Sequence, residues 1–163
     1  MTDTPPNVTR ENYLETLLLY HEEEIMGEAY FYALADHFSD PDEKRKIQLL
    51  AKVERHAAES VRPLLKKYGL IPRSDTELKQ MSLDDANRDG TLSWDAFIQT
   101  VASDYKKYMP AFLALENAAP EEDLPALKVL TEHETISIEF AEQECLGAQC
   151  TESILKRYIK EDE

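Results

Sequence analysis

Residues 41–69 read PDEKRKIQLLAKVERHAAESVRPLLKKYG and have the period of one long amphipathic helix. A proline in the first turn and a glycine after the last turn are typical of a helix start and a helix stop. Glu54 lies near the centre of the apolar face, whereas His56 projects to the opposite side, and Pro63 bends the final turns. The pattern therefore predicts a carboxylate inside the protein. The apolar face consists of Ile47, Leu50, Val53, Ala57, Val61, Leu64 and Leu65.

The same period indicates three more long helices, separated by turn residues. A polar connector over residues 69–92 contains one short helical stretch at 75–83 and is long enough to travel the length of a bundle. We therefore predict a single domain over residues 1–163: an all-α, up-down-down-up four-helix bundle with one long crossover connector. The other predicted helices cover residues 9–38, 93–117 with a kink at Pro110, 123–146, and a short 151–160, with N-caps at Thr9, Ser93, Asp123 and Thr151.

The composition is that of an acidic helical protein. The formal net charge is −15, which argues against nucleic acid and anionic membrane surfaces as partners, because both are polyanions. Leu and Ala far outnumber Val and Ile, and there are only 4 glycines. A sheet protein has the opposite balance of branched residues, so the composition favours helices.

Cysteine content and hydropathy indicate the compartment. Cys145 and Cys150 are the two cysteines, which excludes a disulfide framework and a structural zinc site built on cysteines. No apolar run approaches the roughly 20 residues that cross a bilayer. The first ten residues also lack the apolar core of a secretory signal. We therefore expect a cytoplasmic protein without membrane contact.

Polar side chains interrupt the apolar faces of all four long helices at a similar depth. Buried carboxylates are costly unless they are protonated, hydrogen-bonded or bound to metal. Carboxylates and an imidazole at one level would form a pocket that suits iron or manganese. The alternative is a metal-free network of satisfied core side chains. The residues concerned are His21, Glu24 and Glu28 in the first helix, Glu54 in the second, Tyr105 and Tyr108 in the third, and His133 and Glu134 in the fourth.

Three of these places resemble the ferritin-like superfamily, in particular its rubrerythrin-like branch. They are Gly27-Glu28-Ala29 in the first helix, Glu54-Arg55-His56-Ala57 in the second and His133 in the fourth. A di-iron site of that superfamily takes a Glu from each of two helices and a Glu-x-x-His from each of the other two. The resemblance therefore implies Glu28 and Glu54 as ligands.

The ligand pattern departs from that superfamily at two places. Ala57 stands three residues after Glu54, where a His is expected, and Leu130 stands three residues before His133, where a Glu is expected. At most half of the ligand set is present, so we predict one metal ion, iron or manganese, rather than two. Possible substitutes for the absent ligands are His21, Glu24 and Glu134.

The connector contains a stretch that resembles an EF-hand loop, residues 85–97, DANRDGTLSWDAF. Position 12 is Ala96 where a bidentate Glu should be, so calcium binding should be weak or absent. The alternative is a turn over residues 87–90, followed by Ser93 as a helix N-cap. In the calcium interpretation the ligands are Asp85, Asn87, Asp89 and the carbonyl of Thr91 at positions 1, 3, 5 and 7, with Gly90 at position 6 and Ser93 at position 9.

Two functions fit this sequence. The first is a non-haem iron or manganese oxidoreductase acting on oxygen or peroxide, in which Tyr105 or Tyr108 exchanges protons or electrons. Cysteine pairs of a rubredoxin-type domain are absent from the sequence, so electrons would come from a separate donor. The second is a metal-free helical bundle that acts as a binding or dimerisation module with a degenerate calcium-type loop. In both cases we expect a homo-oligomer, most simply a dimer.

Overall fold

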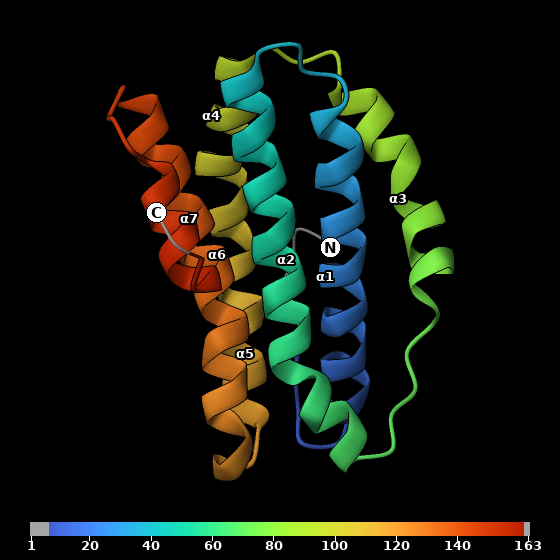
Figure 1. Ribbon diagram of the computed structural model, residues 1–163. Coiled ribbons are helices and arrows are strands. Elements are labelled where there is room, and N and C mark those ends of the chain that lie inside the picture. Colours follow the sequence, from blue (N-terminus) through green and yellow to red (C-terminus); the bar gives the residue numbers. More distant parts are fainter. Residues whose placement is uncertain (1–6, 162–163) are drawn as a thin grey trace.

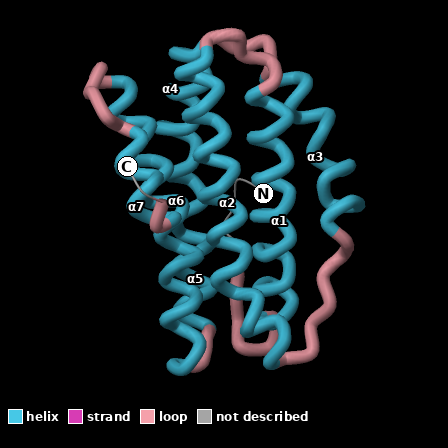
Figure 2. Tube along the Cα trace, in the orientation of Figure 1, coloured by secondary structure: helices cyan, strands magenta, loops and turns pink. Residues whose placement is uncertain are grey.

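The computed structural model describes residues 7–161, and every regular element in that range is a helix (Figure 1, Figure 2). The prediction of an all-helical protein is confirmed. Over the same range, no helix is long and apolar enough to cross a membrane. The elements are α1 (Tyr13–Ala35), α2 (Pro41–Lys67), α3 (Asp75–Asp89), α4 (Trp94–Asp104), η1 (Tyr105–Tyr108), α5 (Met109–Ala118), η2 (Glu121–Asp123), α6 (Leu124–Cys145) and α7 (Glu152–Ile159), where η denotes a 3₁₀ helix.

Helices α1 and α2 form an antiparallel pair joined by a tight turn (Figure 1). The carboxylate of Asp40 accepts hydrogen bonds from the backbone N–H groups of Asp42 and Glu43, and Pro41 occupies the first turn of α2. These contacts satisfy N–H groups that a helix start leaves without partners. Helix α1 begins at Tyr13, so Thr9 lies one turn too early to be its N-cap.

Helix α3 lies on the outer side of α1, inside the segment that connects α2 to α4 (Figure 1). It is longer than the predicted stretch 75–83, because it continues to Asp89. Buried Glu22 of α1 holds the chain before α3, since its Oε2 accepts from the backbone N–H and the Nε of Arg73 at 2.9 and 3.0 Å. One face of α3, with residues four apart, is buried: Leu78, Ser82 and Ala86.

The third long helix is broken by a 3₁₀ turn one turn before Pro110. A proline has no N–H for the carbonyl of the residue four positions earlier, and its ring crowds that carbonyl. The chain therefore tightens over residues 105–108 as η1, and Pro110 lies in the first turn of α5, where proline is tolerated. The predicted kink is thus a full break, and it places Tyr105 and Tyr108 on η1.

Asp123 joins three helix ends rather than capping α6. It was predicted as an N-cap, but its side chain makes no cap hydrogen bond. The buried carboxylate instead accepts from the hydroxyls of Tyr13 and Tyr68 at 2.8 and 2.6 Å and from Lys67 Nζ at 2.8 Å. The start of α1 and the end of α2 are therefore fixed to the start of α6. Thr151 was predicted as the N-cap of the short last helix, and its side chain also makes no cap hydrogen bond.

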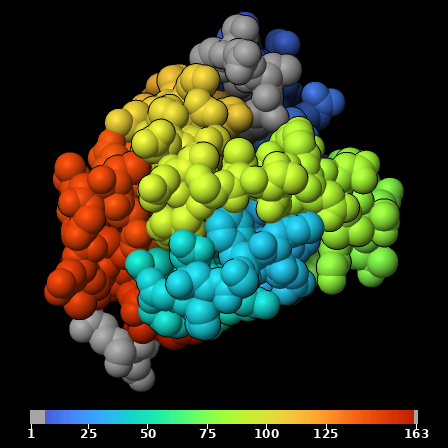
Figure 3. Space-filling view, turned by 90° about the horizontal axis from the view of Figure 1, so that it is seen from above, coloured from blue at the N-terminus to red at the C-terminus, as the bar shows by residue number. Residues whose placement is uncertain are grey.

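The opposite end of the protein is closed by the connection between α3 and α4. Figure 3 looks onto this end and shows residues around 90 lying against the turn between α1 and α2. A Cβ on Gly90 would collide with the ring of His37, whose Nε2 lies 3.3 Å from Asn87 Oδ1. The glycine therefore permits the close approach of these two segments.

The apolar core consists of two main clusters with a polar level between them. Along α1, α2 and α6, the residues of one cluster end before those of the other begin. Glu24, Glu54 and His133 all lie in these intervals between the clusters. The prediction of a common polar level is therefore confirmed for α1, α2 and α6. The intervals run from Tyr20 to Phe31 on α1, from Val53 to Ala57 on α2 and from Leu130 to Ile136 on α6.

Candidate metal centre

Three buried side chains from three helices meet at this polar level. Glu24 of α1, Glu54 of α2 and His133 of α6 are 4%, 6% and 1% exposed. Each offers one ligand atom, and these atoms lie within 4.8 Å of one another. Two carboxylates and an imidazole form a donor set that suits a divalent transition metal. This group of residues, Glu24, Glu54 and His133, is called the metal group below.

The ring of His133 is oriented by its own helix. Its Nδ1 contacts the carbonyl oxygen of Leu130, one turn earlier, so we assign the ring proton to Nδ1, and the lone pair of Nε2 faces the cavity. Nε2 lies 2.8 Å from Glu24 Oε2, 3.3 Å from Glu134 Oε2 and 3.8 Å from Glu54 Oε2. An Nδ1–H bond to a backbone carbonyl is the usual way in which a metal-binding histidine is fixed.

Gly27 allows the carboxylate of Glu54 to reach this position. A Cβ placed on Gly27 would lie 2.5 Å from Glu54 Oε2 and 3.0 Å from its Cδ. The backbone of α1 therefore packs directly against the Glu54 carboxylate. This close approach is the physical reason for a glycine in the middle of α1, where it costs helix stability.

The carboxylates of the site lack partners for their full charge. Burial first, and then neighbouring carboxylates, raise the pKa of Glu24 to about 8, although a hydrogen bond with Glu54 opposes this. Burial and Glu24 raise the pKa of Glu54 well above its usual value, and burial raises that of Glu134 to about 8. Glu24 Oε2 and Glu134 Oε1 are buried and accept no hydrogen bond. A bound cation would compensate the charges of Glu24 and Glu54, so the three residues of the metal group fit a metal ion.

The pKa shifts predict how the stability of the metal-free protein depends on pH. The folded chain binds more protons than the unfolded chain between about pH 4.5 and pH 8, because the pKa values of Glu24 and Glu134 are raised from 4.5 to about 8. The free energy of unfolding should therefore fall as the pH rises through this window. Thermal unfolding with chelator at several pH values measures it. Glu134→Gln should reduce the slope and exposed Glu139→Gln should not; equal slopes would contradict the assignment.

The metal group lies in the wall of a cavity of about 340 Å³, and both tyrosines predicted as catalytic also line this cavity. Tyr105 and Tyr108 of η1 line it, as does Glu134. Burial raises the pKa of Tyr105 well above its usual value, with Glu54 adding to the effect. Glu23 also lines the cavity, with a buried Oε2 that accepts no hydrogen bond. Glu23 was not identified from the sequence as a site residue, and only its position next to Glu24 could have indicated it.

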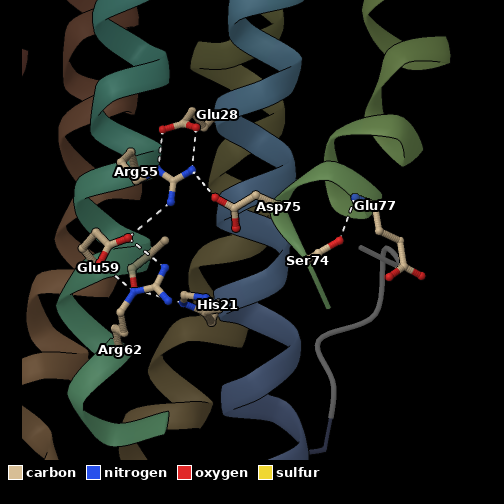
Figure 4. Close-up of polar contacts among 9 residues, drawn as sticks. His21, Glu28, Arg55, Glu59, Arg62, Ser74, Asp75 and Glu77 are labelled. Carbon is tan, nitrogen blue, oxygen red and sulfur yellow. Dashed lines mark hydrogen bonds and ion pairs between the residues drawn. The ribbon is translucent and has the colours of Figure 1, made fainter. Parts of the chain in front are cut away.

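Glu28 does not belong to the metal group. Arg55 of α2 binds both of its carboxylate oxygens, with Nε at 2.6 Å and Nη2 at 2.8 Å (Figure 4). The same guanidinium reaches Asp75 of α3 at 3.0 Å and Glu59 at 3.2 Å. Glu28, which the resemblance implies as a metal ligand, is therefore not part of the group, because Arg55 binds its carboxylate and Glu24 lies with Glu54 and His133 instead.

The histidines outside the metal group have structural contacts. His21 is buried, its Nδ1 lies 3.0 Å from the carbonyl oxygen of Ala58, and burial lowers its pKa. It is therefore a satisfied core histidine and no substitute ligand. His56 packs edge-on against the ring of Tyr158. The predicted register of α2 is confirmed in that Glu54 is buried, whereas His56 points away from the metal group and lies half-buried against α7.

The connector does not form an EF-hand loop. Asp85, Asn87 and Asp89 lie in the last turns of α3, where residues two apart point in nearly opposite directions and do not converge on one ion. Asp85 and Asp89 both bind Arg88, and Asp89 also accepts from the hydroxyl of Tyr30 at 2.6 Å. The predicted calcium ligands are therefore wrong as a set. That calcium binds weakly or not at all stays a prediction.

The remaining connector residues have capping roles. The hydroxyl of Thr91 donates to the carbonyl of Arg88 at 3.0 Å, which closes the end of α3. Ser93 Oγ accepts from the N–H of Ala96 at 3.2 Å. Ser93 is therefore the N-cap of α4, as the alternative interpretation predicted, while residues 87–89 are helical rather than a turn.

Comparison with known proteins adds no relative. The chain matches no protein-family model, and neither a similar curated protein nor a similar solved structure is found. A proposal of function therefore depends on the geometry of the site.

Proposed function

We propose that the protein binds one iron or manganese ion through Glu24, Glu54 and His133. The observation that supports this most strongly is the position of His133 Nε2, 2.8 Å from a buried Glu24 oxygen that accepts no hydrogen bond. Two atoms that each offer a lone pair repel one another unless a proton or a cation lies between them. Because three carboxylates surround Nε2, a divalent cation compensates more of the buried charge than a proton does.

We also propose that the protein has a ferritin-like, rubrerythrin-like architecture. In this proposal the four long helices are α1, α2, the segment from α4 to α5, and α6, in an up-down-down-up order with α3 inside the crossover. Figure 1 supports it, since α1 and α6 run in one direction and α2, α4 and α5 run in the other. The metal group draws its side chains from α1, α2 and α6.

An oxidoreductase acting on oxygen or peroxide is the activity that this site favours. Bound iron or manganese supplies one-electron chemistry toward such small oxidants. Tyr105 of η1 lines the cavity, and burial raises its pKa, so its phenol keeps its proton and can donate a hydrogen bond at the cavity wall. The chain supplies two exposed cysteines and no Cys pair of rubredoxin type, so we propose a separate electron donor.

A metal-free binding or dimerisation module is the competing proposal. It is favoured by the hydrogen bond between the carboxyl groups of Glu24 and Glu54, which satisfies part of the site with one shared proton. In that case the pocket has a structural role only.

Metal content separates the two proposals. Protein produced in medium supplemented with iron and manganese should contain up to one ion per chain by elemental analysis, since the donor set is too small for two. The metal-free protein should then bind one manganese ion in a calorimetric titration. Absence of transition metal in both experiments would favour the metal-free module, and two ions per chain would contradict the single site.

A further inference from the structure

The cavity extends well beyond the metal group. Its wall includes residues of α1, α2, α3, η1, α5 and α6. The volume of about 340 Å³ lies at the lower end of the range for small-molecule pockets, roughly 300–1,000 Å³. A molecule with a single ring fits a space of this size.

The charged side chains of the wall are acidic. The described residues that line the cavity include Glu and Asp side chains and no Lys or Arg. Two carboxylate oxygens that lie outside the metal group, Oε2 of Glu23 and Oε1 of Glu134, are buried and accept no hydrogen bond. Glu134 as a whole is 5% exposed. Buried oxygens without a donor are costly, and a cation with N–H groups would satisfy them.

Apart from Gly27 and Ser82, the uncharged residues of the wall are aromatic or sulfur-containing. Aromatic faces attract cations and also pack against flat rings. Methionine side chains adapt to ligands of different shape. A small hydrated ion gains little from such a surface, whereas an organic cation with a ring contacts both parts of the wall. The residues are Met26, Tyr30, Phe31, Met81, Tyr105, Tyr108 and Phe112.

We propose that this cavity binds a small aromatic ammonium compound, with the ammonium group held by Glu23 and Glu134 and the ring among the aromatic side chains. The proposal rests on the proposed function in one respect: the metal ion takes Glu24, Glu54 and His133, which leaves Glu23 and Glu134 for the ligand. Met81 of α3 is half exposed and lines the cavity, so it marks the side from which a ligand enters.

Benzylamine is a suitable probe, because it combines one ring with a primary ammonium group. A calorimetric titration of manganese-loaded protein at pH 7 should show saturable binding of one benzylamine per chain. Benzyl alcohol, which has the same shape without the charge, should bind at least about tenfold more weakly, since a charged hydrogen bond is worth more than a neutral one. This comparison uses the unmodified protein, so it is independent of the folding of any variant.

Variants then locate the ammonium group. Glu23→Gln should weaken benzylamine binding about tenfold or more while the protein still binds manganese. Glu139→Gln, which removes an exposed charge from α6, is the matched control and should change neither. Glu134→Gln is a second variant with the same expected loss of benzylamine binding.

Several results would overturn the proposal. They are equal affinity for benzylamine and benzyl alcohol, no binding of either, an unchanged affinity in Glu23→Gln, or benzylamine binding to the metal-free protein but not to the manganese-loaded protein. The last result would mean that the amine only substitutes for the metal ion. Failure of the metal proposal is seen separately, because manganese binding is measured on the same samples before the amine is added.

Discussion

Replacing Glu54 by alanine is expected to remove manganese and iron binding, while replacing Glu28 by glutamine leaves it unchanged. Glu54 provides one of the three ligand atoms that lie within 4.8 Å of one another, and a methyl group cannot act as a ligand. Glu28 lies one turn after Glu24 on α1, but Arg55 binds its carboxylate at 2.6 and 2.8 Å. A calorimetric titration of each metal-free variant with manganese measures the difference.

Thermal unfolding of the same variants separates loss of a ligand from loss of the fold. An ion that binds only the folded chain adds about 2.7 kcal/mol of stability at a free concentration one hundred times its Kd. For a domain of this size that corresponds to a rise in Tm of roughly 5–10 °C. We expect this rise for the unmodified protein and for Glu28→Gln, and no rise for Glu54→Ala. A rise in Glu54→Ala, or no rise in Glu28→Gln, would contradict the site.

Without metal, Glu54→Ala has a smaller effect on stability, whose sign depends on the partner that is left. The variant removes a buried carboxyl group with a raised pKa, and loss of this costly buried group favours the folded state. It also leaves Glu24 without its hydrogen-bond partner, at a cost on the order of 1–3 kcal/mol. The response of the Tm to added metal is therefore the informative quantity.

The depth of the site could be predicted from the sequence because helix geometry converts residue numbers into position. Glu54 and His133 lie on apolar faces at similar distances from the ends of their helices, and each falls between the two core clusters. The register of α2 was also predictable, since Glu54 and His56 are two residues apart and project to different sides. The depth of the site and the register of α2 follow from the helical repeat of each segment alone.

The choice between two carboxylates on α1 could not be predicted in this way. Glu24 and Glu28 are one turn apart and lie on the same face of the helix. A side chain from another helix decides between them, because Arg55 binds Glu28 together with Asp75 of α3. Asp75 lies at the start of α3, where the helix was predicted to begin, but its contact with Arg55 is set by the packing of α3 against the bundle. Contacts between three helices are needed to identify the ligand.

The connector shows a local pattern that tertiary packing overrides. Oxygen-bearing side chains at every second residue, Asp85, Asn87 and Asp89, are typical of a calcium loop, but the same residues are compatible with a helix until Gly90. Burial of Leu78, Ser82 and Ala86 against α1 favours the helix, because one face of α3 then leaves water. The sequence pattern contains no information about this partner surface.

Gly27→Ala is expected to weaken metal binding about 10–100-fold, the usual range for residues that position a ligand. The three nearest atoms to a Cβ at this position all belong to Glu54, with Oε2 at 2.5 Å. The carboxylate ends a flexible side chain, so it can move away from α1 and out of the metal group. Alanine also raises helix propensity by about 1 kcal/mol, so the fold should keep its stability while the site loses its affinity.

A double-mutant cycle with Glu54→Ala tests whether this effect acts through Glu54. When Glu54 is alanine, the atoms that the new Cβ would meet are removed, so Gly27→Ala should stabilise the metal-free protein by up to about 1 kcal/mol. When Glu54 is present, the same substitution should stabilise less, because the carboxylate must move. Equal stabilisation in both backgrounds, together with unchanged manganese affinity in Gly27→Ala, would mean that the Glu54 carboxylate does not lie against the backbone of α1. The position assigned to the Glu54 carboxylate would then be wrong, and Glu54 would no longer count as the metal ligand from α2.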